Sequence, residues 1–361
     1  MAAGQVSRFL PPTTHLWLGS ADPDFLDLAR REIAAADPEA VFQPLPEAPG
    51  LVRVCSQRSF ADLAQAWQAN PPIFLRHICP IHQERQLDEI SLLRLDQNLL
   101  AAIDPALSFS VQTRRFGKLN VKPFQVNAAL AEQVMATVGS PLQVKDPQQV
   151  ISVVLLASST GLRAWLGLSL AAQNLSTWAG GVHRFRRDPD QISRAEFKLL
   201  EAIQVFRVPL QPGGRALDLG AAPGGWSRIL RLHGQQVTAV DPAELDERLR
   251  HDAGICHHRL SAQAYLARCP GQFHLILNDM RMDGRASAHL MAAFAPHLEP
   301  QGAAVMTLKL PHQHRLRVLR QTLDILGSAF PVVRARHLFH NRSEITLYLQ
   351  KGIPAPHSST T

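Results

Sequence analysis

The sequence predicts a mixed α/β protein in which an α+β region precedes a doubly wound sheet. Three observations support this fold class. After residue 193, short apolar runs alternate with helical patterns, as in an open sheet covered by helices. The stretch 217–227, LDLGAAPGGWS, places a glycine-rich loop between a strand and a helix, which is typical of a Rossmann-like half-fold. The length of 361 residues allows two or three domains.

The first part of the chain is expected to fold from two strand–helix pairs. Asp22 or Asp24 is placed to cap the first helix, and Ser59 is placed as the N-cap of the second. We therefore expect an α+β, ferredoxin-like domain over residues 1–95. Alternation and helical spacing of the apolar residues predict strands at 14–19 and 51–56 and helices at 21–36 and 59–69.

The next part shows a strand at 107–115 with a basic end, then an amphipathic helix at 122–139. Two β-rich runs follow, joined by a turn at 158–161. This strand–helix–strand–strand order, with basic residues on the first strand, resembles a THUMP domain, a module that binds structured RNA. The resemblance implies an RNA-binding domain over residues 96–175, and the alternative is an ordinary α+β accessory domain.

The rest of the chain is expected to form a linker, the doubly wound domain and a tail. Residues 176–192 are rich in turn formers and charge, as in a linker. The alternating pattern occupies residues 193–351, and the polar end at 352–361 is expected to be flexible.

Composition excludes several classes of protein. No apolar run reaches the roughly 18 residues of a membrane helix, and the N-terminus shows no pattern of a secretory signal. Four scattered cysteines form no CxxC pair, so we expect neither a zinc site nor a disulfide framework, and a cytoplasmic location. A net charge of +7 is compatible with a polyanionic partner such as RNA. Nothing indicates an oligomeric state.

The glycine-rich loop predicts a cofactor site. A strand, a glycine loop, a helix and a second strand ending in Asp241 form a nucleotide-binding half-fold, with the acid placed for ribose hydroxyls. The spacing is neither GxGxxG nor that of a phosphate-binding P-loop. An acidic strand end without a phosphate-binding lysine favours S-adenosylmethionine, whose sulfonium is a cation. The alternative is a purely structural turn.

The motif D-L-G-x-x-P-G-G-W resembles that of the FtsJ-type RNA ribose 2′-O-methyltransferases. That family uses a Lys-Asp-Lys-Glu tetrad, and each member has a counterpart in its own context. The motifs SRAEFKLLE, LILNDM, AVMTLKLP and HNRSEITLYL supply, in that order, Lys198, Asp279, Lys309 and Glu344. Taken singly, each is equally compatible with a surface charge or a buried ion pair. Together they imply methyl transfer to a ribose oxygen.

The chemistry agrees with these residue types. A ribose hydroxyl is a weak acid, and Lys309 could accept its proton only as a neutral amine with a lowered pKa. Desolvation and the charge of Lys198 would lower that pKa, whereas Asp279 would oppose them. Glu344 is expected to hold Lys198 and the substrate sugar. No metal is needed for this chemistry.

Residues 173–350 further resemble the RlmM-type enzymes, which modify a cytidine ribose in large-subunit ribosomal RNA. The resemblance implies cofactor contacts by Ser193, Gly220, Ala222, Pro223, Gly224, Gly225, Asp241 and Asp279. One position departs from that family, which carries an acid facing adenine after the third strand. The chain offers Ser261 or Gln263 there, either of which can form a hydrogen bond without charge.

Basic residues gather around the predicted site. Seven Lys/Arg and one acid, Asp324, lie between Lys309 and Arg342. Such a cluster suits a phosphate backbone, although a solvated helix face explains part of it. Trp178 and Phe185 are candidates for stacking on bases or for packing. The predicted RNA contacts are Arg114, Arg115, Arg184, Arg186, Arg187, Arg336 and Arg342.

Three functions are therefore open. The sequence favours an S-adenosylmethionine-dependent RNA 2′-O-methyltransferase acting on ribosomal RNA. The same chemistry on transfer RNA or another RNA is the second. The third is an RNA-binding or assembly protein that retains the fold with weak catalysis.

Overall fold

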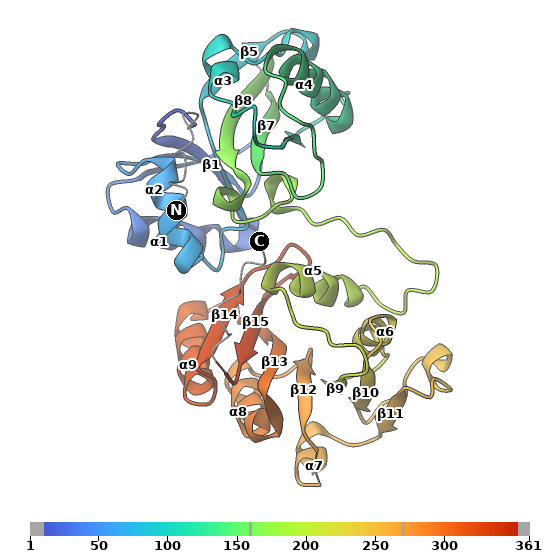
Figure 1. Cartoon of the computed structure of the whole chain (residues 1–361). Coiled ribbons are helices and arrows are strands. Elements are labelled where there is room, and N and C mark those ends of the chain that lie inside the picture. Colours follow the sequence, from blue (N-terminus) through green and yellow to red (C-terminus); the bar gives the residue numbers. More distant parts are fainter. Residues whose placement is uncertain (1–10, 159–160, 269–270, 353–361) are drawn as a thin grey trace, which may run out of the picture. The chain divides into compact units, whose positions relative to one another are not determined.

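The computed structural model describes residues 11–158, 161–268 and 271–352. The chain divides into two compact units, one ending at Val182 and the other beginning at His183 (Figure 1). Each unit is described by itself below. The turn predicted at 158–161 includes Ser159 and Thr160, which lie outside the described residues, as does most of the predicted tail.

The first unit begins with a βαββαβ element whose four strands are all antiparallel, in the order β2-β3-β1-β4. This is the ferredoxin-like arrangement. Ser59 caps the second helix, as predicted. Asp22 instead caps a short 3₁₀ turn, and the first helix after it has Phe25 at its N-cap position, without a side-chain cap. The elements are β1 (Leu16–Ser20), α1 (Leu26–Ala36), β2 (Val41–Pro44), β3 (Leu51–Cys55), α2 (Phe60–Ala69) and β4 (His77–Pro80).

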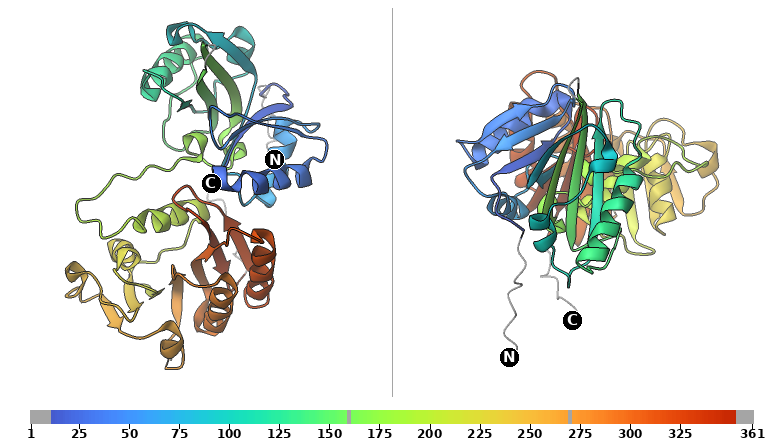
Figure 2. Two further views of the ribbon diagram at one scale, coloured as in Figure 1. Left: turned by 180° about the vertical axis from the view of Figure 1, so that it is seen from behind. Right: turned by 90° about the horizontal axis from the view of Figure 1, so that it is seen from above.

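A second sheet follows in the same unit, in the order β5-β8-β7-β6. Its strands and helices are β5 (Gln83–Leu87), α3 (Gln97–Ala101), β6 (Phe109–Phe116), α4 (Pro123–Thr137), β7 (Gln149–Ser158) and β8 (Gly161–Leu170). Alternate residues of β7 face opposite ways. Val153 and Leu155 pack against α3 and α4, whereas Val154 and Leu156 pack against the first sheet. The right-hand view of Figure 2 shows the green strands between the blue first sheet and helix α4.

The sequence prediction differs from this unit in three short strands. β2 is mostly exposed and β4 is buried at every position, so neither shows the alternation from which strands are predicted. β5 lies within the predicted domain 1–95, yet it pairs with β8 of the predicted domain 96–175. The order of β6, α4, β7 and β8 is the predicted one, and the THUMP assignment itself stays a prediction.

The second unit is built on a seven-stranded sheet in the order β11-β10-β9-β12-β13-β15-β14. The first five strands in this order, from β11 through β10, β9 and β12 to β13, are parallel to one another. Strand β15 is antiparallel to both of its neighbours. The elements are α5 (Glu196–Phe206), β9 (Arg215–Leu219), α6 (Gly225–Leu232), β10 (Gln236–Val240), β11 (Ile255–His258), α7 (Ala262–Leu266), β12 (Phe273–Asn278), α8 (Gly284–Phe294), β13 (Leu298–Lys309), α9 (Arg315–Gly327), β14 (Val332–Arg336) and β15 (Glu344–Gln350).

The chain reverses its direction of winding between β9 and β12. These strands are neighbours, but β10 and β11 extend the sheet to one side and β13 extends it to the other. Ligands bind α/β sheets in the crevice beyond the carboxyl ends of the strands at such a switch point. Leu219 of β9 and Asn278 of β12 are paired across the two strands. The glycine-rich loop follows Leu219 and Asp279 follows Asn278, so the two meet at this switch point.

The core of this unit explains Trp226, the last residue of the motif. Its side chain is 4% exposed and lies in one apolar cluster with Leu199 and Phe206 of α5. Its indole Nε1 donates to the carbonyl of Ala195 at 2.8 Å. Trp226 therefore packs α6 against α5.

The remaining composition-based expectations concern cysteines and membranes. Cys55, Cys79 and Cys256 are free thiols, and Cys269 lies outside the described residues. Among the residues with described structure, no helix is both long and apolar enough to cross a membrane.

Leu277 tests the core of the second unit. It is fully buried in the central strand β12, so Leu277→Ala should lower the free energy of unfolding by about 2–5 kcal/mol. Leu232→Ala is the matched control, because Leu232 is 63% exposed and its loss should change stability by about 0.5 kcal/mol or less. Urea unfolding followed by circular dichroism measures both. Equal effects of the two substitutions would contradict the assigned core.

Candidate active site

Four charged side chains from four different elements meet at the carboxyl edge of the sheet. Lys198 projects from α5 and Asp279 directly follows β12. Lys309 ends β13 and Glu344 begins β15, and these two residues are paired across the antiparallel strands. Residues paired in this way have their side chains on the same face of a sheet. The sheet register therefore brings together two members of the predicted tetrad.

Both carboxylates contact both lysines, but not equally. Lys198 Nζ lies 2.7 Å from Glu344 Oε1 and 3.3 Å from Asp279 Oδ1. Lys309 Nζ lies farther from the same acids, at 3.5 Å from Glu344 Oε2 and 3.7 Å from Asp279 Oδ1. All four predicted residues are thus brought together, and Lys198 has the closer ion pairs.

These contacts separate the two lysines electrostatically. Desolvation by burial lowers the pKa of Lys309, and the positive charge of Lys198 lowers it further. The negative charges of Asp279 and Glu344 oppose this shift but do not cancel it. Burial also lowers the pKa of Lys198, but its contacts with Asp279 and Glu344 outweigh burial and raise that pKa overall. Lys309 is therefore the lysine that gives up its proton more readily.

Thr307 supports Asp279 and was not predicted. Its hydroxyl donates to Asp279 Oδ1 at 2.6 Å, and the side chain is 1% exposed. Thr307 and Lys309 are two residues apart on β13, so their side chains lie on the same face of the sheet. A polar residue two positions before Lys309, inside an apolar strand, is the sequence signal that could have indicated it.

The glycine-rich loop joins β9 to α6 and is fixed by the predicted acid. Asp241 Oδ2 accepts a hydrogen bond from the amide of Ala222 at 3.1 Å, and Oδ1 accepts from the amide of Ala243 at 2.8 Å. The peptide bond between Ala222 and Pro223 is cis. Gly220 and Gly224 both have positive φ, at 75° and 113°. The carboxylate of Asp241 therefore holds the glycine-rich loop in place. Its contact with ribose hydroxyls stays a prediction.

The predicted cofactor residue Ser193 lies against the start of α6. A Cβ atom on Gly225 would come within 2.3 Å of Ser193 Oγ, so only glycine permits this approach. Gly220, Pro223, Gly224 and Gly225 are thus gathered in one loop with Ser193 beside it. Ser261 is the N-cap of α7, where its hydroxyl oxygen accepts from the amide of Ala264. Its adenine-binding role stays a prediction.

A buried aspartate in the motif was also missed. Asp218 is 1% exposed on β9, and Ser227 Oγ donates to its Oδ2 at 2.7 Å. Burial raises the pKa of Asp218 to about 7. The carboxyl of Asp218 therefore carries less than a full charge near neutral pH.

Two further buried glutamates of α5 hold segments around the site. Glu196 accepts from the amide of Ile192 at 2.7 Å and pairs with Arg228 of α6 at 2.9 Å. Glu201 accepts from the backbone amides of Phe339 and His340. Both lie in the motif that identified Lys198, and an acid on the apolar face of a helix is the signal that could have revealed them.

The predicted RNA contacts of the second unit differ in exposure. Arg184, Arg186, Arg187 and Arg342 are exposed. His340 Nε2 lies 3.0 Å from the carbonyl oxygen of His183, the residue before Arg184, so Arg184 lies near the segment that carries Arg342.

Arg336 is a correction to the predicted RNA surface. It is 6% exposed, because it closes β14 near the buried ring of His183, and we leave it out of the surface. Phe185 stacks on Phe197 with ring centroids 5.9 Å apart, which favours its packing role.

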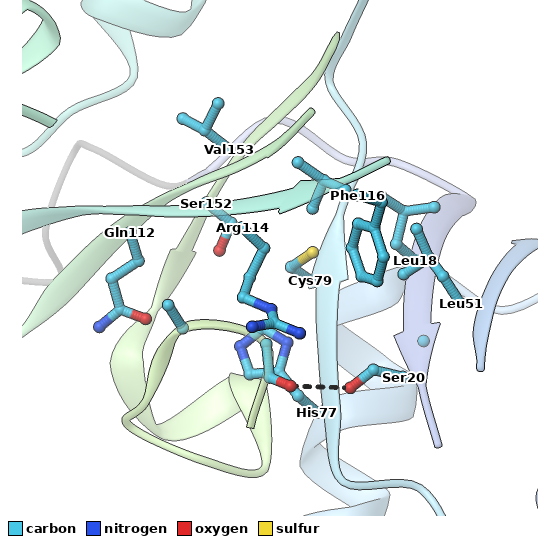
Figure 3. A pocket seen from close by; sticks show the side chains of 14 residues that line it. Leu18, Ser20, Leu51, His77, Cys79, Gln112, Arg114, Phe116, Ser152 and Val153 are labelled. Atoms are coloured by element: carbon cyan, nitrogen blue, oxygen red, sulfur yellow. Dashed lines mark hydrogen bonds between the residues drawn. The ribbon is translucent and has the colours of Figure 1, made fainter. Parts of the chain in front are cut away.

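In the first unit, Arg115 is exposed whereas Arg114 lines a pocket with His77, Gln112 and Phe116 (Figure 3). The guanidinium of Arg114 lies over the ring of Phe116 at 5.3 Å. Burial lowers the pKa of His77 to about 3, so its ring is neutral at physiological pH. Arg114 is therefore engaged in packing beside a neutral histidine, and Arg115 is the more available of the two for RNA.

Within the described parts of the chain, no group of three or more His, Cys, Asp or Glu residues could hold a metal ion. The tetrad consists of amines and carboxylates already paired with one another.

A glycine-rich loop ordered by an acid, at the switch point of a doubly wound sheet, is the arrangement with which α/β folds bind nucleotide-containing ligands. Residues 191–314 match the family model of the FtsJ-like methyltransferases. The chain therefore contains an FtsJ-like methyltransferase domain. Lys198, Asp279 and Lys309 fall inside the matched range, and Glu344 lies beyond it.

Curated relatives carry one name, ribosomal RNA large subunit methyltransferase M. The chain is 35% identical over 178 residues to that of Halorhodospira halophila, covering 48% of this chain and 51% of the relative. It is 31% identical over 207 residues to that of Shewanella denitrificans, covering 53% and 56%. A longer alignment, with that of Tolumonas auensis, is 27% identical over 272 residues and covers 68% and 73%. In the first two alignments the chain spans about half the length of the relatives it matches.

Gly224 tests the loop as the cofactor site. An alanine there would have φ of 113° and a Cβ 2.3 Å from Leu249 Cδ1, so the loop must shift. We expect Gly224→Ala to weaken S-adenosylmethionine binding by about tenfold or more, measured by isothermal titration calorimetry. Gly213→Ala is the control, because Gly213 also has positive φ but nothing lies within 4 Å of its Cβ position. Equal dissociation constants for the two variants would contradict this assignment.

Proposed function

We propose that the protein is an S-adenosylmethionine-dependent RNA 2′-O-methyltransferase, with Lys309 as the general base. The observation that carries the proposal is the assembly of Lys198, Asp279, Lys309 and Glu344 at one edge of an FtsJ-like domain. A small-molecule substrate would not require two lysines in one crevice.

The proposed step assigns a separate task to each residue. S-adenosylmethionine supplies the methyl group when bound. Lys309, as a neutral amine, accepts the proton of the ribose 2′-hydroxyl as that oxygen takes the methyl group. Lys198 stays charged between the two carboxylates and can donate to the sugar oxygens. Asp279, oriented by Thr307, holds the amine of Lys309, so positioning supplies much of the acceleration.

The proposed target is a cytidine in large-subunit ribosomal RNA. The name shared by the curated relatives supports large-subunit ribosomal RNA. The family resemblance of the sequence supports the cytidine ribose. Exposed Arg184, Arg186, Arg187 and Arg342 support contacts with the phosphate backbone, and Arg115 supports a second contact region.

Replacing the proposed base tests the reaction directly. Lys309→Ala should reduce label transfer from tritiated S-adenosylmethionine to unmodified ribosomal RNA by at least about 100-fold, because the proton acceptor is lost. Lys145→Ala, at an exposed lysine of the first unit, should retain the wild-type rate. Undiminished transfer by the Lys309 variant would contradict the assigned base.

The same assay separates the alternatives. Transfer RNA transcripts labelled faster than ribosomal RNA would favour a different RNA target. RNA bound on a filter without any label would favour the assembly protein with weak catalysis.

The pH dependence of the chemical step provides an independent test. Because the base acts as the neutral amine, the single-turnover rate should rise with pH through the pKa of Lys309. That pKa is below 10.5, so the rising limb should appear at a lower pH than that of a free lysine. The charge on Lys198 persists through this range because its pKa is raised. A rate that is independent of pH between about pH 6 and pH 9 would contradict a lysine base.

A further inference from the structure

Helix α5 carries a buried glutamate that the proposed reaction leaves without a task. Glu201 is 1% exposed, and a buried carboxylate is costly unless hydrogen bonds or opposite charges compensate for its desolvation. Lys198, on the same helix, belongs to the tetrad. Glu196, also on α5, holds Ile192 and Arg228 on the side of the glycine-rich loop.

Both oxygens of Glu201 bind backbone amides. Oε1 accepts from the amide of Phe339 and Oε2 from the amide of His340, each at 2.8 Å. A carboxylate that accepts from two consecutive amides forms strong, charge-assisted hydrogen bonds with a defined geometry. Glu201 therefore fastens the loop 337–343, which connects β14 with β15, to α5.

That loop ends at Glu344. The amide of Leu310, the residue after Lys309, donates to the carbonyl of Ser343 at 3.1 Å, so the end of the loop is also fixed to β13. Glu344 Oε1 contacts Lys198 Nζ at 2.7 Å.

Helix α5 is thus joined to this segment twice, through Lys198 and through Glu201. These two residues are three positions apart and lie on neighbouring parts of the helix surface. A displacement of the loop would move Glu344 relative to Lys198.

We propose that Glu201 is a positioning residue, which holds the amides of Phe339 and His340 and so sets Glu344 against Lys198 and Lys309. The inference rests on the proposed methyl transfer for its effect on rate. Glu201 itself contacts neither substrate nor cofactor in this role.

The test compares two buried glutamates of one helix in the full-length protein. Glu201→Gln replaces one acceptor oxygen with an amide NH₂ group that opposes a backbone N–H. Glu196→Gln removes the charge on the other side of α5, where one carboxylate oxygen faces Arg228. We expect Glu201→Gln to lower kcat about tenfold with an unchanged KM for S-adenosylmethionine. Glu196→Gln should instead raise that KM. Glu201→Asp keeps the charge but is too short for both amides, and its kcat should fall between those of wild type and Glu201→Gln.

Hydrogen–deuterium exchange supplies a readout without activity. Exchange of the segment 337–344 should accelerate in Glu201→Gln, and exchange of 188–193 should accelerate in Glu196→Gln, at a temperature well below the melting of every variant. Should the wild type transfer no methyl group to RNA, the proposed function fails, and exchange still decides whether Glu201 holds the loop.

Either of two results would overturn the inference. One is wild-type exchange of 337–344 or a wild-type kcat in Glu201→Gln. The other is the same set of changes in both glutamine variants, namely a lower kcat, a higher KM for S-adenosylmethionine and a lower melting temperature. Such a shared change indicates only a structural role.

Discussion

The pairing of Lys198 with two carboxylates is the interaction on which the proposed chemistry depends. Two lysines share one crevice with two acids, and equal sharing would leave both amines protonated. Glu344 and Asp279 lie closer to Lys198 than to Lys309. Burial acts on both lysines, but the closer ion pairs outweigh it only at Lys198. Groups of one type with pKa values moved in opposite directions are a recurring sign of separate roles in a reaction.

The sheet makes this unequal arrangement possible. Strand β15 runs antiparallel between β13 and β14, so Glu344 enters the carboxyl edge at the start of its strand while Lys309 leaves at the end of its own. Asp279 follows β12 at the switch point, where the glycine-rich loop also begins. Helix α5 adds Lys198 across this edge, and its glutamates fix the segments on either side.

Sequence reasoning identified the fold of the second unit and the tetrad because both depend on local patterns. LDLGAAPGGWS is one uninterrupted stretch of sequence, and so is each of the four motifs that carry a lysine or an acid of the tetrad. Contacts that depend on tertiary packing were beyond it. The burial of Arg336 could not be read from a basic cluster, since the pattern does not show which segment covers the end of β14. Glu201 binds the amide of Phe339, which is 138 residues away, and β5 pairs with the distant strand β8. Nothing in the local sequence indicates either pairing.

The site of the transferred methyl group tests the central claim most directly. Ribosomal RNA methylated by the wild-type protein with labelled S-adenosylmethionine can be digested to nucleosides and analysed by mass spectrometry. The arrangement of Lys309 beside the ion-paired Lys198 predicts that the label is found on the ribose, as a 2′-O-methyl nucleoside. Label on a base carbon or nitrogen, with the ribose unmodified, would contradict it.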